Sequence, residues 1–127
     1  MTIANLLYSK LAGTTAVSTI VSTRIYPVIM PQDPTVPAIS YQQISMTEQD
    51  GTSTLREQRY QVDCWDDDFA GVQTLGDAVQ AALEEWTDTD QTPRVKMSRI
   101  VGSYHDYENE TGLYRVSFDV MCNTSGE

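Results

Sequence analysis

The residues that could do chemistry are few, and the single histidine is the first candidate. His105 is followed by Asp106, and a carboxylate that orients a histidine is part of many catalytic sites. Both residues fall in a stretch with the pattern of a β-strand, where neighbouring side chains point to opposite faces of the sheet. Asp106 is therefore poorly placed to orient His105, and we expect His105 to be a surface or sheet residue.

Three consecutive carboxylates, Asp66, Asp67 and Asp68, form a second candidate, a divalent-cation site. Hard cations select carboxylate oxygens, but their ligands must converge on one point, and three successive side chains diverge. The apolar residues that follow recur at three- and four-residue steps, as on the buried face of a helix. Because acidic residues satisfy free N–H groups at the start of a helix, we interpret the three residues as helix capping.

The strong enzyme motifs are absent from the sequence. A Gly-rich phosphate loop, a nucleophile elbow, a Cys-x-x-Cys pair and a His-Glu-x-x-His helix are all missing. Cys64 and Cys122 each lie in an apolar, strand-like run without a companion Cys or His at metal-ligand spacing, so we expect buried free thiols and a reducing cytoplasm. We predict no catalytic residues, no cofactor and no bound metal.

The charge balance restricts the partners of the chain. Its 127 residues include 8 basic and 18 acidic ones, which gives a net charge of −10. Such a field repels the phosphates of nucleic acids and anionic membrane surfaces, so ordinary DNA binding is disfavoured. No apolar run approaches the roughly 18 residues of a membrane span, and the N-terminus lacks the pattern of a signal peptide. A chain of this length builds one core, and we expect a single domain over residues 1–127.

Helical spacing marks two main segments that must position these residues. The first runs from Thr2 to Ala12, and a short helical turn is expected after Thr15. The second follows the three aspartates. Its buried face is expected to contain Val72, Leu75, Val79, Leu83 and Trp86.

Five segments have the pattern of β-strands. They are residues 24–30, interrupted by Pro27 as in an edge strand, and residues 38–45, 56–65, 94–107 and 114–122. A polar loop is expected over residues 46–55 and a hairpin turn over residues 108–112. The order is α-β-β-β-α-β-β. We therefore predict an α+β fold with a largely antiparallel β-sheet and two main helices packed on one face.

Aromatic residues suggest contact surfaces. Seven tyrosines and two tryptophans are many for so short a chain, and both residue types are enriched at protein interfaces. Strand alternation puts Trp65 on the face opposite Tyr60, Val62 and Cys64. Trp65 should therefore either pack at the entry to the following helix or belong to a contact surface.

Four segments, taken in order, carry a resemblance to a known family. They are Arg24-Ile25-Tyr26-Pro27, Pro37-Ala38-Ile39-Ser40-Tyr41-Gln42, Arg59-Tyr60-Gln61-Val62-Asp63-Cys64-Trp65, and Tyr107 with Glu110-Thr111-Gly112-Leu113-Tyr114-Arg115. Their order and spacing, together with the short N-terminal helix, span nearly the whole chain. This pattern resembles the tail completion proteins, also called tail terminator or tail-to-head joining proteins, of long-tailed bacteriophages.

The resemblance implies a virion structural protein without enzymatic activity. Such a protein forms a ring, a hexamer by the resemblance, at the head-proximal end of the tail. There it ends polymerisation of the tail tube and joins the tail to the filled head. The implied partners are further copies of the chain, the tail tube protein and the head connector proteins. Genomic DNA passes through the lumen without specific binding, no membrane is involved, and assembly takes place in the host cytoplasm.

Within the matching segments we take six residues as candidates for subunit, tail or head contacts. They are Tyr26, Pro27, Tyr41, Arg59, Trp65 and Arg115. The net charge and the acidic residues of the polar loop suggest that an acidic surface faces the lumen, because a negative wall lets duplex DNA slide without sticking. The lumen candidates are Glu48 and Asp50.

Two alternatives remain open at this point. One is a head completion or connector-associated protein on the other side of the same joint. The other, from a different class, is an acidic inhibitor that mimics DNA. Mimicry calls for regularly spaced carboxylates on one face, whereas basic residues interrupt the carboxylates here. These residues are Arg56, Arg59, Arg94, Lys96, Arg99 and Arg115.

Overall fold

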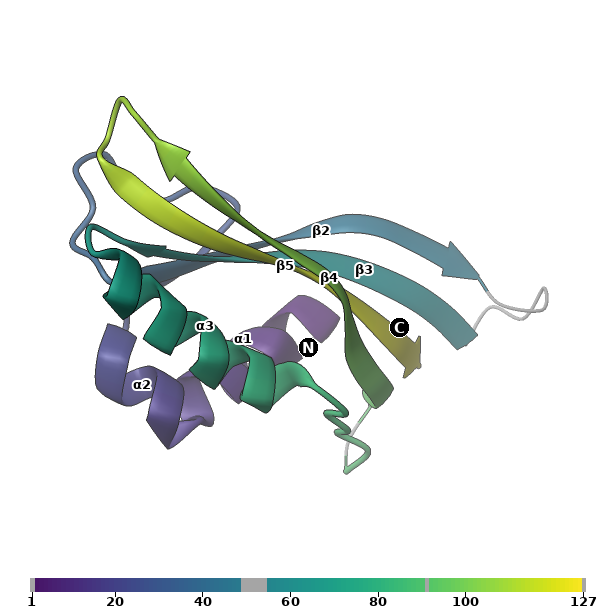
Figure 1. Ribbon diagram of the computed structural model, residues 1–127. Coiled ribbons are helices and arrows are strands. Elements are labelled where there is room, and N and C mark those ends of the chain that lie inside the picture. The colour runs from purple at the N-terminus through teal and green to yellow at the C-terminus, as the bar shows by residue number, and fades with distance from the viewer. Residues whose placement is uncertain (1, 49–54, 91, 127) are drawn as a thin grey trace.

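Three helices cover one face of a five-stranded sheet, and the part of the chain that the structure describes has no helix on the opposite face (Figure 1). The computed structural model describes residues 2–48, 55–90 and 92–126. The helices and the inner sheet face share one cluster of buried residues. The predicted α+β fold is confirmed, with its order of elements and its helices on one face.

Helices α1 (Ile3–Gly13) and α2 (Thr15–Val21) form the first part of the helical layer. Thr2 caps α1: its hydroxyl accepts a hydrogen bond from the Asn5 N–H, and the Asn5 side chain accepts one from the Thr2 N–H. This reciprocal cap satisfies donors that the first helical turn leaves free. The buried residues of the two helices have the expected helical spacing: Ile3, Leu6, Leu7, Leu11, Val17 and Val21.

Helix α3 (Phe69–Leu83) differs from the expectation at its end but not at its start. Its start is as predicted, because the Asp68 carboxylate accepts a hydrogen bond of 3.0 Å from the Gly71 N–H. Its end comes before Trp86, which was expected on the helical face. Glu85 adopts a left-handed φ of 57°, and Trp86 is buried in an extended segment whose carbonyl accepts from the Ser98 N–H. Pairing with a strand has replaced the last helical turn.

The strands are β1 (Ile25–Pro27), β2 (Ala38–Glu48), β3 (Leu55–Asp66), β4 (Arg94–Glu108) and β5 (Leu113–Ser125). Their order across the sheet is β1-β2-β3-β5-β4. All neighbours are antiparallel except β1 and β2, which are parallel. Pro27 ends an edge strand, as its missing N–H requires.

Strand β2 is longer than predicted. The expected loop over residues 46–55 is wrong at both ends, because β2 continues to Glu48 and β3 begins at Leu55. The pair Glu48 and Arg56 still lies in register. A bulge between Gln43 and Ser45 explains why the apolar residues of this strand lack a strict period of two.

The inner face of the sheet packs on α3 at close range. A side-chain carbon on Gly76 would lie 3.2 Å from Cγ1 of Val116, so the missing side chain lets the helix approach β5. Tyr60, Val62 and Cys64 of β3 are buried on this inner face, as the alternation predicted. By the same alternation, Trp65 and Arg115 lie on the open face.

Candidate interaction surfaces

The open face of the sheet carries a cluster of charged and aromatic side chains centred on Arg115. The register puts Trp65 and Asp106 on either side of Arg115 across three neighbouring strands. The guanidinium carbon of Arg115 lies 5.3 Å from the ring centroid of Trp65 and 5.4 Å from that of Tyr104. Arg115 is thus in cation–π contact with both rings, a contact that holds its planar group in a fixed orientation.

Two carboxylates complete the open-face cluster. Nη2 of Arg115 lies 2.8 Å from Oδ2 of Asp106, and Nη1 lies 4.0 Å from Oδ2 of Asp63. Asp63 is 8% exposed and also accepts hydrogen bonds from the Gln61 amide. A carboxylate this buried needs a counter-charge, which Arg115 supplies.

Trp65 is a member of this cluster rather than of the helix entry. Its indole Nε1 donates a hydrogen bond of 3.0 Å to Oγ of Ser40. Two hollows of about 250 and 680 Å³ lie beside it, the larger one between residues 30–34 and the β4–β5 hairpin. Trp65 therefore contributes to a shaped surface on the open face.

The other contact candidates lie in different surroundings. Arg59 forms an ion pair with Asp119 on the open face, at 3.1 Å between Nε and Oδ1, and both side chains are substantially exposed. Tyr26 is half-buried and Pro27 is exposed at the β1 edge. Tyr41 is buried in the core, and burial, with a contribution from Tyr8, raises its pKa. Tyr41 is thus the candidate least accessible to a partner.

Of the two lumen candidates, Glu48 is exposed at the end of β2. Asp50 lies outside the described residues. The described acidic residues concentrate elsewhere, on α3 and its flanks. Residues 66–90 contain no basic residue and eight acidic ones: Asp66, Asp67, Asp68, Asp77, Glu84, Glu85, Asp88 and Asp90. This acidic stretch is visible in the sequence. The interpretation of the three aspartates as helix caps considers only its first three residues.

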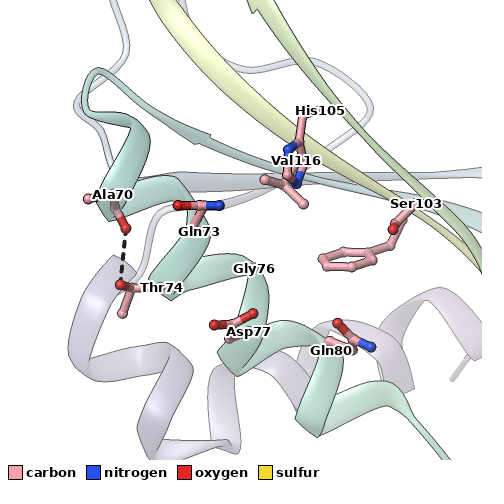
Figure 2. Close-up of a pocket in the computed structure, with 10 residues that line it drawn as sticks. Ala70, Gln73, Thr74, Gly76, Asp77, Gln80, Ser103, His105 and Val116 are labelled. Atoms are coloured by element: carbon pink, nitrogen blue, oxygen red, sulfur yellow. Dashed lines mark hydrogen bonds between the residues drawn. The ribbon is translucent and has the colours of Figure 1, made fainter.

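A groove of about 430 Å³ separates α3 from β4 (Figure 2). Helix α3 contributes Gln73, Asp77 and Gln80 to one side, and β4 contributes Ser103 and His105 to the other. The groove thus presents amides, hydroxyls, one carboxylate and one imidazole, a lining suited to hydrogen bonding. Its floor is formed by Val116 and Phe118 of β5.

The single histidine does not work with its neighbour. His105 lies in the groove, with its ring 5.7 Å from that of Phe69, whereas Asp106 binds Arg115 on the open face. The prediction that the two side chains point to opposite faces is confirmed.

The three aspartates before α3 play separate roles. Asp66 is buried, and burial raises the pKa of its carboxyl group, while its Oδ1 accepts a hydrogen bond from the Asp67 N–H. Gly71 lies so close to the Asp66 carboxylate that a side-chain carbon there would overlap it. Asp68 caps the helix. Across residues 2–48, 55–90 and 92–126, no group of three His, Cys, Asp or Glu side chains could hold a metal ion.

Both cysteines are buried free thiols, as predicted. Burial raises the pKa of Cys122 to about 12 and raises that of Cys64 further, with Asp63 as a second cause for Cys64. A raised pKa favours the protonated thiol, which is the less nucleophilic form of cysteine.

The family model for the tail completion protein gp17 matches residues 5–125 of the sequence. The chain belongs to this tail completion family. The match contains every described strand and helix apart from the first residues of α1, and it confirms the resemblance that the motifs indicated.

This member of the tail completion family also resembles a solved structure. A chain of the "Virion of native gene transfer agent (GTA) particle" superposes with a TM-score of 0.80 at 13% sequence identity. The alignment covers 94% of this chain and 92% of the other. At this identity the likeness establishes a shared fold. The comparison with curated proteins found no match. Among the described residues, no helix is long and apolar enough to cross a membrane.

Proposed function

We propose that this chain forms a ring at the head-proximal end of a phage tail tube, ends tube polymerisation and joins the tail to the head. The family match over residues 5–125 is the observation that carries the proposal. The chain acts as a structural protein without catalytic activity. Its partners are copies of itself, in a hexamer, together with the tail tube protein and the head connector proteins.

The open-face cluster supports a role in protein contacts. Arg115, Trp65 and Tyr104 are residue types that dominate the binding energy of interfaces, and here they are held in place before any partner binds. Arg59 lies on the same face. A preorganised cluster loses little side-chain entropy on binding. We assign this face to contact with a neighbouring virion protein, with Tyr26 and Pro27 at its β1 border.

The distribution of charge supports an acidic lumen. Glu48 and Asp50 remain the candidates for the lumen wall, and the acidic residues on α3 and its flanks are a second source of negative charge. A negative wall keeps duplex DNA away from the protein surface while the genome passes. The ion pairs on the open face, in contrast, make that face unlike a DNA mimic.

Deleting the gene from the particle that encodes this chain tests the proposal. We expect overlong tails that fail to join filled heads, because no ring ends polymerisation, and we expect wild-type protein supplied in trans to restore tail length. Electron microscopy of the particles gives both readouts. Tails of normal length without heads would point instead to a head completion protein, and normal, joined tails would refute the proposal.

A further inference from the structure

Each edge of the sheet leaves part of a long strand open: β4 is the last strand on one side, and on the other side the short edge strand β1 covers only part of β2. On β4, residues 94–98 are covered, because Val95 exchanges backbone hydrogen bonds with Asp88, and Ser98 bonds to Glu85 and Trp86. On β2, residues 39–41 are covered by β1. Within residues 2–48, 55–90 and 92–126, no strand pairs with the outer side of residues 99–108 of β4 or of residues 42–48 of β2, and these two segments are the open halves.

The open halves direct backbone groups outward. In an antiparallel ladder, residues alternate between bonding to one neighbour and to the other. The backbone groups of Ser98 bond away from β5, to Glu85 and Trp86. The alternation can be counted from Ser98 along β5, because the pairing of β5 with β3 has no irregularity. By this count, the backbone groups of Ser103, His105 and Tyr107 of β4 also point away from β5 and are outward-facing. On β2, the backbone groups of Ile39 and Tyr41 bond to residues in and next to β1, away from β3. The same alternation continues from these residues along β2, with one extra residue at the bulge. Its outward-facing residues are Gln43, Met46 and Glu48.

Exposed apolar side chains concentrate along these edges. Among the described residues, ten large apolar side chains are exposed, and eight of them lie on β2, on β4 or directly after β1. The eight are Val28, Ile29, Ile44, Met46, Met97, Val101, Tyr104 and Tyr107. Proteins commonly protect an open strand edge with charges, proline or a very short strand. The open half of β4 has a bulge and three charged residues, Arg99, Asp106 and Glu108, but no proline, and Asp106 is already paired with Arg115 of the same sheet. Its exposed apolar and aromatic side chains, Val101, Tyr104 and Tyr107, are available for pairing.

We propose that the open half of β4 pairs with the open half of β2 in a second copy of this chain, so that the sheet continues from copy to copy around the ring. The proposal rests on the ring of the proposed function. The two edges differ, so each copy uses both of them, and contacts of this head-to-tail kind close into a ring. Such pairing covers the exposed apolar side chains that lie within the two open halves: Ile44, Met46, Val101, Tyr104 and Tyr107.

The topology gives the direction and the stagger of the pairing. Because each step from β2 through β3 and β5 to β4 is antiparallel, β4 runs opposite to β2. Copies that share one orientation about the ring axis therefore pair antiparallel. The register puts Tyr104 level with Ser40, so the open halves lie at opposite ends of the sheet. Neighbouring copies must then be displaced along the strands, as closure of a tilted sheet requires.

The groove between α3 and β4 has room for the incoming strand. Ser103 and His105 have outward-facing backbone groups and side chains in this groove (Figure 2). Gln43 and Met46 have their side chains on the inner face of the sheet. In the proposed pairing, these two side chains of the next copy therefore enter the groove opposite Gln73 and Asp77 of α3. The amide of Gln43 of the next copy matches the hydrogen-bonding lining of the groove.

Amide hydrogen exchange on the wild-type chain tests the pairing directly. Exchange is compared between the ring and single copies of the chain. The rings are those on isolated tails or those formed by purified protein. Mass spectrometry follows peptides that span residues 99–107 and 42–48. We expect both peptides to exchange at least about tenfold more slowly in the ring, because pairing protects the outward N–H groups. Equal exchange in rings and single copies, or protection of one edge alone, as a tail tube strand would give, overturns the proposal.

Matched substitutions provide a second measurement. Ser103→Pro and Met46→Pro each remove one outward N–H, whereas Ser103→Ala and Met46→Ala keep it. We expect both proline variants to fold, as circular dichroism checks, and to lose at least about 90% of ring formation. The alanine variants should form rings. Folded proline variants that form rings as well as their alanine controls would overturn the proposal, and misfolded ones leave the decision to the exchange measurement.

The two proposals can fail separately. If deletion of the gene gives overlong tails but the proline variants restore tail length as well as wild type, only the edge pairing is wrong. If deletion leaves normal tails while purified chain forms rings with both edges protected, only the proposed role in the tail is wrong.

Discussion

At the scale of single residues, Arg115 is the group on which the open-face cluster depends. Replacing Arg115 with Met keeps most of the apolar stem but leaves Asp63 buried without its counter-charge. We expect the free energy of unfolding to fall by about 1–3 kcal/mol, measured by urea denaturation. Adding Asp63→Asn in the same chain should recover part of the loss.

Arg59→Met is the matched control for Arg115→Met. Its partner Asp119 has a side chain that is 43% exposed, so water replaces the lost ion pair, and the free energy should change by less than about 1 kcal/mol. Equal losses from the two substitutions would show that burial of Asp63 does not set the energetics of the cluster.

Asp66 gives the stability of the chain a distinctive pH dependence. Burial raises the pKa of Asp66 in the folded state, so the folded state binds its proton more tightly than the unfolded state does. The contribution of Asp66 to stability is therefore most favourable below the unfolded pKa and is lost as pH rises through the folded pKa. The control is Asp66→Asn, which cannot titrate.

Urea denaturation of both proteins at several pH values measures this effect. The stability of wild type relative to Asp66→Asn should decrease as pH rises from about 3 to about 7. The other carboxylates are common to both proteins, so most of their effects cancel in the difference. A difference that increases with pH would mean that hydrogen bonds from the backbone outweigh burial at Asp66.

The sequence predicts on which face of the sheet a side chain lies, but not which residue that side chain contacts. Alternation along one strand correctly separated His105 from Asp106 and put Trp65 opposite Cys64. The pairing of Asp106 with Arg115 needs the register between two strands, which no local pattern supplies. The burial of Tyr41 likewise depends on packing against helices distant in the sequence.

At the scale of elements, the start of α3 depends on one side chain. Asp68→Ala removes the acceptor of the Gly71 N–H, and we expect a loss of about 1 kcal/mol in the free energy of unfolding. Asp77→Ala is the matched control, because it removes the same charge from an exposed position within the helix. If thermal or urea unfolding gave equal effects for the two variants, net charge rather than capping would explain the result.

Element boundaries were predictable where local chemistry decides them. The caps at Thr2 and Asp68 are residue types that start helices. The end of α3 was not predictable, because Trp86 continues the helical spacing and only pairing with β4 pulls its backbone out of the helix. The extension of β2 to Glu48 also depends on its partner strand, whose register holds polar residues in the ladder.

At the scale of the whole molecule, order and spacing of short segments carried more information than composition. The acidic balance and the aromatic content fit several classes of protein, whereas four segments in a fixed order indicated one family. The open sheet edges could not be found from sequence, because an edge is defined by the strand order β1-β2-β3-β5-β4 and not by any single strand.

The proposed function requires this chain to form the ring that ends the tail. Cryo-electron microscopy of the joint between head and tail, in the particle that encodes this chain, shows where the chain is located. We expect density for the chain in a closed ring at the head-proximal end of the tube, six copies by the family resemblance, and nowhere along the tube. Density for the chain on the head side of the joint or along the tube would refute the proposed function, and so would a mature particle that contains no density for it.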